Sequence, residues 1–74
     1  MARIHRAIED YIKVQESNID YYKTKEKNTD KAEAIKEALD CLLINLSDCD
    51  IEYDNEEKRL YKYVSKNELK YYTE

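Results

Sequence analysis

The chain has 74 residues with 41% charged side chains and a net charge of −4, and it contains neither glycine nor proline. Residues 1–74 are therefore expected to form one small domain whose core is only marginally sufficient, which favours oligomerisation. The absence of glycine excludes Gly-rich phosphate loops and nucleophile elbows. No apolar run approaches the ~20 residues that span a bilayer, and the N-terminus lacks the apolar block of a secretory signal, which predicts a cytoplasmic protein.

The first predicted element is a helix over residues 3 to about 24. Its apolar side chains recur at three- and four-residue steps, interrupted once by Gln15: Ile4, Ile8, Tyr11 or Ile12, Ile19 and Tyr22. The polar segment that follows breaks this pattern. Asn28, Thr29 or Asp30 can act as the N-cap of a second helix, so a helical hairpin is expected.

The second helix is predicted over residues 30 to 46. Its core stripe consists of Ile35, Leu39, Leu42 and Leu46, widened by Ala38 and Leu43, and its other side carries Glu33, Glu37 and Asp40. Ile44 lies off the main stripe. This position suits a second contact surface, and we expect Leu42, Leu46 and Ile44 to form an oligomer interface; the alternative for Ile44 is simple exposure at a helix end.

After Ser47 the periodicity changes from helical to alternating. Residues 49–54 and 59–64 can pair as a β-hairpin, joined by a loop of three to five residues because glycine is missing. The segment from Ser65 to Glu68 matches a capping box that would open a short C-terminal helix. The prediction is therefore an α+β fold with the order ααββα. An all-α fold of three helices, with residues 55–72 as one helix, is the alternative.

The sequence offers little material for catalysis. His5 is the only histidine, and Cys41 and Cys49 are separated by eight residues, which is not a metal-ligand spacing. An acidic helix also disfavours a reactive Cys41 thiolate. We therefore expect a non-enzymatic protein with no catalytic residue, metal or cofactor, and structural roles for the two thiols.

The most unusual stretch is residues 48–57, which carries six acidic side chains and no basic one. The six are Asp48, Asp50, Glu52, Asp54, Glu56 and Glu57. On a strand, same-face side chains are about 6.6 Å apart, whereas one DNA strand advances about 3.4 Å per phosphate. Alternate carboxylates could thus imitate a row of phosphates and bind a basic DNA channel. The alternative is a solvated face that protects an edge strand from aggregation.

Tyrosines alternate with basic residues in "KRLYKYVSK", a pattern found in nucleic-acid-binding segments. A basic strand beside an acidic one is also explained by cross-strand charge pairs that stabilise the hairpin. We therefore predict no direct binding of nucleic acid.

In its size, acidity and Gly-free, Lys/Tyr/Asn-rich composition, the chain resembles the small acidic phage-encoded inhibitors of the bacterial DNA sliding clamp, of the Twort-phage type. The segment "QESNIDYY" has the Gln15, Ile19, Tyr21 and Tyr22 of a clamp-binding peptide in a different register, and the first helix also requires Ile19 and Tyr22 for its core. The resemblance implies a host bacterial cytoplasm and a host DNA-binding protein, the sliding clamp, as partner.

Two functions follow as expectations. The first is a dimeric acidic protein that inhibits a host DNA-handling protein by occupying its basic channel. The second is a structural or regulatory helical module that associates with another copy or with a partner helix.

Overall fold

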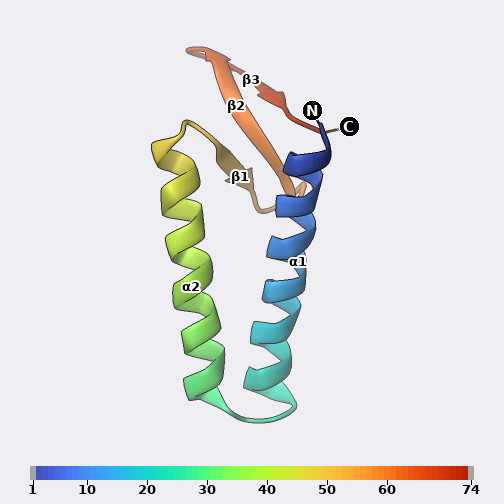
Figure 1. Ribbon diagram of the computed structural model, residues 1–74, viewed down its shortest axis with the longest axis vertical. Coiled ribbons are helices and arrows are strands. Elements are labelled where there is room, and N and C mark those ends of the chain that lie inside the picture. The colour runs from blue at the N-terminus through green and yellow to red at the C-terminus, as the bar shows by residue number, and fades with distance from the viewer. Residues whose placement is uncertain (1, 74) are drawn as a thin grey trace.

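The computed structural model describes residues 2–73 and shows two long helices and a small sheet (Figure 1). The elements are α1 (Ala2–Thr24), α2 (Thr29–Asp48), β1 (Glu52–Asp54), β2 (Arg59–Ser65) and β3 (Glu68–Tyr71). The α+β class is confirmed. The molecule is elongated, with extents of 43 × 21 × 20 Å. Within residues 2–73 there is no helix whose length and apolar character would let it cross a membrane.

The two helices form the antiparallel hairpin that the sequence predicts, with bounds close to those expected. Asn28 is the N-cap of α2, and its side-chain oxygen accepts a hydrogen bond from the Lys31 N–H at 3.1 Å. The preceding residue, Lys27, has a φ of 52°. The chain thus makes a left-handed turn there without the glycine that usually occupies such a position.

The sheet is antiparallel in the order β1-β2-β3. Glu52 pairs with Tyr61, and Asp54 pairs with Arg59. The connection of four residues, 55–58, agrees with the loop length predicted for a Gly-free hairpin. It closes through a hydrogen bond of 2.7 Å from the Lys58 N–H to the Asp54 carbonyl, with Lys58 at a φ of 58°.

The predicted C-terminal helix is wrong, and so is the alternative of one helix over residues 55–72, because the chain turns back after Ser65 and adds β3 to the sheet. Tyr71 pairs with Tyr61 and Leu69 with Tyr63, and a register shift follows between Tyr63 and Ser65. A helix of one or two turns has few internal hydrogen bonds to offset its nucleation cost. The edge of β2 instead offers an antiparallel ladder and the aromatic cross-strand pair of Tyr61 and Tyr71.

The core lies between the helices and the inner face of the sheet. Its buried side chains are Ile12, Leu39 and Leu60, and half-buried residues surround them: Ile8, Ile19, Leu42, Leu43, Leu46, Ile51, Tyr53 and Tyr72. β1 and the first part of β2 cover one face of the helical hairpin at one end, and the β2–β3 hairpin projects beyond the helices (Figure 1). The opposite half of the hairpin has no sheet beside it.

Candidate functional site

The six acidic residues of 48–57 do not form the row on a single strand that the alternation predicts. α2 extends to Asp48, and Asp50 lies in the junction between α2 and β1 with a φ of 63°. Only residues 52–54 are in a strand, and Glu56 and Glu57 are in the following turn. α2 continues two residues beyond its expected end at Leu46, and the N–H groups of Cys49 and Ile51 donate to the Leu46 carbonyl at its C-terminus. The spacing argument for a row of phosphates on one strand is therefore incorrect.

Asp54 has a structural role that the sequence pattern does not reveal. Its carboxylate accepts hydrogen bonds from the Tyr71 hydroxyl at 2.7 Å and from the N–H groups of Glu56 at 2.9 Å and Glu57 at 3.2 Å. The Tyr71 bond, followed by the two backbone bonds, holds the Asp54 pKa below its usual value, and the same bond raises the Tyr71 pKa. Asp54 thus orders the β1–β2 turn and joins β1 to β3.

The other five acidic side chains have no ion-pair partner in the part of the chain that the structure describes. The nearby cations are engaged elsewhere: the Lys58 ammonium lies 3.3 Å from Glu16, and the Arg59 guanidinium lies over the Tyr71 ring at 4.0 Å. Of these two residues, Arg59 pairs across the strands with Asp54 and its charge helps to lower the Asp54 pKa, but neither residue forms an ion pair with the other five acidic side chains in the described residues. The negative charge at the α2–β1 junction remains available to a partner.

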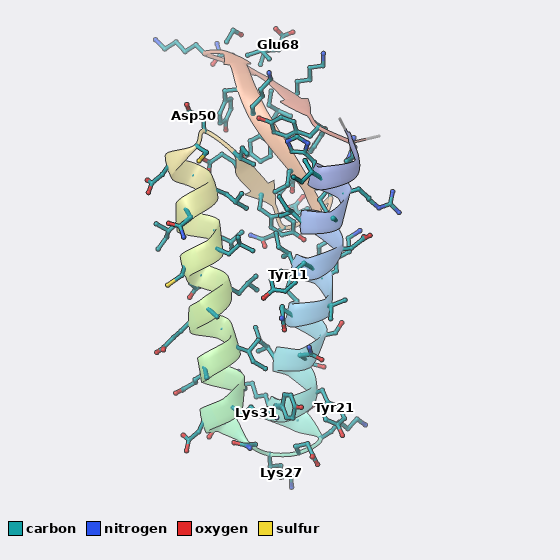
Figure 2. All side chains as sticks on the ribbon, in the orientation of Figure 1. Tyr11, Tyr21, Lys27, Lys31, Asp50 and Glu68 are labelled. Carbon is teal, nitrogen blue, oxygen red and sulfur yellow. The ribbon has the colours of Figure 1, made fainter. Side chains whose placement is uncertain are left out.

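The acidic character continues along the outer face of α2. Five exposed acidic side chains lie on the side opposite the core stripe: Asp30, Glu33, Glu37, Asp40 and Asp48. With 100° per residue they fall within an arc of about 80°, and at 1.5 Å per residue they span about 27 Å. We call these five residues together with Asp50 the α2 acidic face. Figure 2 shows Asp50 at the sheet end of α2 and Lys31 at the other end.

The three residues of the predicted oligomer interface do not lie on the same side of α2. Leu46 packs against the hydrophobic core, whereas Ile44 is 61% exposed beside the acidic side chains. Leu42 packs against the core and also lines an apolar groove of about 380 Å³ with Ile4, Ala7, Ile8 and Tyr11. Leu42 and Leu46 thus lie on the core side of α2 and Ile44 on its outer side, and the interface expected over these three residues stays a prediction.

The groove belongs to a second apolar stripe on α1. Exposed apolar side chains recur there at heptad-like steps: Ile4, Ala7, Tyr11, Val14 and Tyr21. Val14 is 56% exposed and Tyr11 is 49% exposed. Exposed apolar patches of this kind often mark interaction surfaces. The apolar periodicity of the sequence includes this exposed stripe, but it predicts that Ile4 and Tyr11 lie in the core stripe of the first helix.

One buried carboxylate was missed by the sequence analysis altogether. Glu9 is 2% exposed, and its oxygens accept hydrogen bonds from the Leu60 N–H at 2.6 Å and from the Thr73 hydroxyl at 2.9 Å. The bond to Leu60 lies where β3 ends, next to the bond from the Tyr72 N–H to the Leu60 carbonyl. Glu9 thus connects α1, β2 and the C-terminal segment. The sequence signal for this burial is the position of Glu9 between Ile8 and Ile12, on the buried side of α1.

Two other buried polar atoms, the Tyr53 hydroxyl and the Arg59 Nε, have no hydrogen-bond partner among the described residues. Burial raises the pKa of Tyr53 to about 12, and the carboxylates of Glu16, Glu9 and Asp54 add to the shift. The Arg59 guanidinium also donates to the Thr73 carbonyl. These groups place several polar atoms on the inner side of the sheet.

The remaining candidate groups lie at the surface. Cys41 and Cys49 are exposed, and neither forms a disulfide within the described residues. His5 stacks on Tyr72 with ring centroids 4.0 Å apart. Among residues 2–73 no cluster of three His, Cys, Asp or Glu side chains has the arrangement of a metal site.

Comparison with known proteins gives no relative: no family model, curated protein or solved structure matches the chain. The function is therefore argued from the surfaces described above.

Proposed function

We propose that this chain is a non-enzymatic acidic protein that binds and inhibits a DNA-handling protein of a bacterial host by occupying its basic DNA channel. The sliding clamp is the specific candidate, named from the resemblance in size and composition. The observation that supports the proposal is the α2 acidic face, which carries six exposed carboxylates without a paired cation in the described residues. The bacterial cytoplasm is the compartment in which such a partner is found.

A rigid helix is a suitable carrier for this charge. Successive acidic side chains along α2 are separated by about 4.5–6 Å where they are three or four residues apart. One DNA strand would place about eight phosphates along the same 27 Å. The five carboxylates on the helix therefore have a charge per unit length that is lower than that of DNA but comparable to it. A basic channel that binds phosphates by Coulomb attraction would attract this face and accelerate association. The interaction weakens with added salt.

We further propose that two copies associate through the second apolar stripe of α1. The chain exposes 5845 Å², about 1,000 Å² more than the ~4,800 Å² expected for a folded monomer of 8.9 kDa. A standard interface buries about 800 Å² on each partner. The radius of gyration, 13.8 Å, likewise exceeds the ~11 Å of a compact domain of this length. Association would double the acidic surface presented to a partner.

The second candidate function is a structural or regulatory helical module, and the exposed stripe of α1 favours it. In that case Tyr11 and Val14 carry the interaction with another copy or with a partner helix, and the acidic residues serve only solubility. The two functions differ in salt dependence, because apolar association does not weaken as the ionic strength rises.

Binding of the chain to a purified bacterial sliding clamp, measured by biolayer interferometry from 50 to 500 mM NaCl, tests the proposal. The variant E33Q/E37Q/D40N removes three charges from α2 and should weaken binding at least tenfold at low salt. The matched control D20N/E26Q/E68Q removes three exposed charges elsewhere and should weaken it less than threefold. Equal losses in the two variants would show that only net charge matters, and unchanged binding in both would overturn the electrostatic mechanism.

A further inference from the structure

A notch of about 470 Å³ opens between the α2–β1 junction and the free edge of β2. β1 pairs with β2 only as far as Tyr61, so the edge of β2 beyond that residue has no strand beside it on this side. The notch is lined by Cys49, Asp50, Glu52, Lys62, Tyr63 and Tyr72. It adjoins the α2 acidic face through Asp50.

Ser47 contacts both acidic residues of the notch, through the backbone of Asp50 and through the carboxylate of Glu52. The Asp50 N–H donates to the Ser47 carbonyl at 2.9 Å, and the Ser47 hydroxyl donates to Glu52 at 3.0 Å. Neither carboxylate forms an ion pair in the described part of the chain. Because Glu52 already has one hydrogen bond to the protein, its orientation costs less to fix when a cation binds.

The wall of the notch is aromatic and already has a cation beside it. Tyr72 is fixed by parallel stacking on His5, with an interplanar angle of 5°. The Lys62 ammonium lies 5.8 Å from the centroid of the Tyr72 ring, within the range of a cation–π interaction. Tyr63, on the same strand as Lys62, is 61% exposed and supplies a second ring. The notch therefore combines the carboxylates and aromatic faces that bind a positively charged side chain.

We propose that this notch receives an arginine side chain of the basic partner, with Asp50 and Glu52 accepting hydrogen bonds from the guanidinium and Tyr72 or Tyr63 stacking on it. The inference rests on the proposed function, which supplies a basic partner, and names the contact that anchors it. Lys62 is the resident cation that the arginine displaces.

Arginine is favoured over lysine by the chemistry of the notch. A guanidinium is planar, stacks on aromatic rings and donates to two acceptors at once, whereas an ammonium is a compact, strongly hydrated point charge. The chain itself contains the same combination on the neighbouring strands. The Arg59 guanidinium stacks on Tyr71 at 4.0 Å, and the hydroxyl of that ring donates to Asp54.

The test is an NMR titration of the ¹⁵N-labelled full chain with N-acetyl-arginine methylamide, in the absence of any partner protein. Saturable shifts should be concentrated at Asp50, Glu52, Tyr63 and Tyr72. The neutral citrulline analogue should give no saturable shift at these residues. Equal binding of the citrulline analogue, or absence of saturable shifts in the notch with the arginine probe, would overturn the assignment; a lysine analogue that binds as tightly would overturn the choice of arginine.

Three variants determine which groups are responsible. The double variant D50N/E52Q should weaken the arginine probe at least fivefold, the scale expected for removing partly exposed charge partners; asparagine also tolerates the left-handed backbone of Asp50. K62Q removes the competing cation and should strengthen binding about threefold. K36Q, which makes the same charge change on α2 away from the notch, should leave it within 1.5-fold. If K62Q and K36Q behave alike, the cation displacement is wrong.

This titration separates the notch from the proposed function. Arginine binding in the notch together with failure to bind the sliding clamp would overturn that choice of partner and leave the notch assignment supported. Clamp binding that D50N/E52Q leaves intact, with no arginine binding in the titration, would overturn the notch and support the broader acidic surface.

Discussion

Replacing Glu9 by alanine should destabilise the fold more than any other single change of a carboxylate. The change removes the acceptor of the Leu60 N–H, and Leu60 is completely buried. A buried donor without a partner costs about 1–3 kcal/mol, and hydrogen bonds to charged groups contribute about 1.5–3 kcal/mol each. The loss of the Thr73 hydroxyl bond adds to this. Since these terms overlap, we expect a total of about 3–5 kcal/mol.

That loss is large for a chain of 74 residues, whose unfolding free energy should be about 4–11 kcal/mol at 0.05–0.15 kcal/mol per residue. Urea unfolding followed by circular dichroism at 222 nm, at one fixed protein concentration, provides the assay. With a slope of about 1 kcal/mol/M the midpoint should fall by about 3 M, or the variant should be unfolded in water.

Two variants show whether the hydrogen bonds are the cause. E9Q keeps an oxygen that can accept from Leu60 but loses the charge, so it should cost less than E9A, about 1–2 kcal/mol. E33A, an exposed position on α2, should change stability by less than about 0.5 kcal/mol. A midpoint for E9A within 1 M of the unmodified chain, at an unchanged slope, would refute the role assigned to Glu9.

Four further outcomes are expected. Because the Tyr53 pKa is raised from 10.0 to about 12, stability should be fully retained below pH 10 and decline as the pH rises from 10 to 12; Y53F should reduce this decline and, by removing an unpaired buried hydroxyl, should not destabilise the protein at pH 7. The Asp54 pKa is lowered from its ordinary 3.8, so its stabilisation is present above pH 3.8 and lost as the pH falls through the folded-state value. D54N should therefore have a lower urea midpoint than the unmodified chain at pH 7, and the difference between the two midpoints should shrink as the pH falls below 3.8. K27G should raise the urea stability by about 1 kcal/mol, since glycine adopts the left-handed conformation without a steric cost. V14E should lower the mass measured by sedimentation equilibrium from dimer to monomer, whereas I44E should leave it unchanged; the reverse result would support the interface first expected on α2.

Local patterns in the sequence were sufficient for the helices and the first hairpin. Apolar steps of three and four residues determine both helices, and the capping preference of Asn28 marks the start of α2. The lack of glycine indicated a loop of three to five residues, and the four residues before Arg59 fall within that range. These features depend on neighbours in the chain, so periodicity and turn chemistry contain the required information.

The errors arose where tertiary contacts decide. The capping-box pattern at Ser65 is compatible with a helix, but the free edge of β2 makes a third strand more favourable. Alternation in residues 48–51 resembles a strand, yet α2 continues to Asp48. The role of Glu9 was inaccessible because its partners, Leu60 and Thr73, lie 51 and 64 residues away along the chain.

The sequence predicted the acidic character of the candidate site but not the arrangement of its residues in space. The acidic stretch was correctly singled out as a feature that needs explanation, but Asp54 serves the turn and Asp48 lies on a helix. The continuous surface follows α2, where Glu37 and Asp40 had been noted only as the outer side of a helix. Which exposed charges form one surface depends on the packing of the helices, and the sequence alone does not give that packing.

A clamp-loading assay tests the central claim most directly. A bacterial sliding clamp is loaded by its loader onto primed circular DNA with the chain present at increasing concentrations, and the fraction of clamp on DNA is measured. The unmodified chain should abolish loading, E33Q/E37Q/D40N should require at least tenfold more protein for the same effect, and clamp already closed around DNA should not bind the chain. Loading that proceeds with the chain bound to the clamp would contradict occupation of the DNA channel.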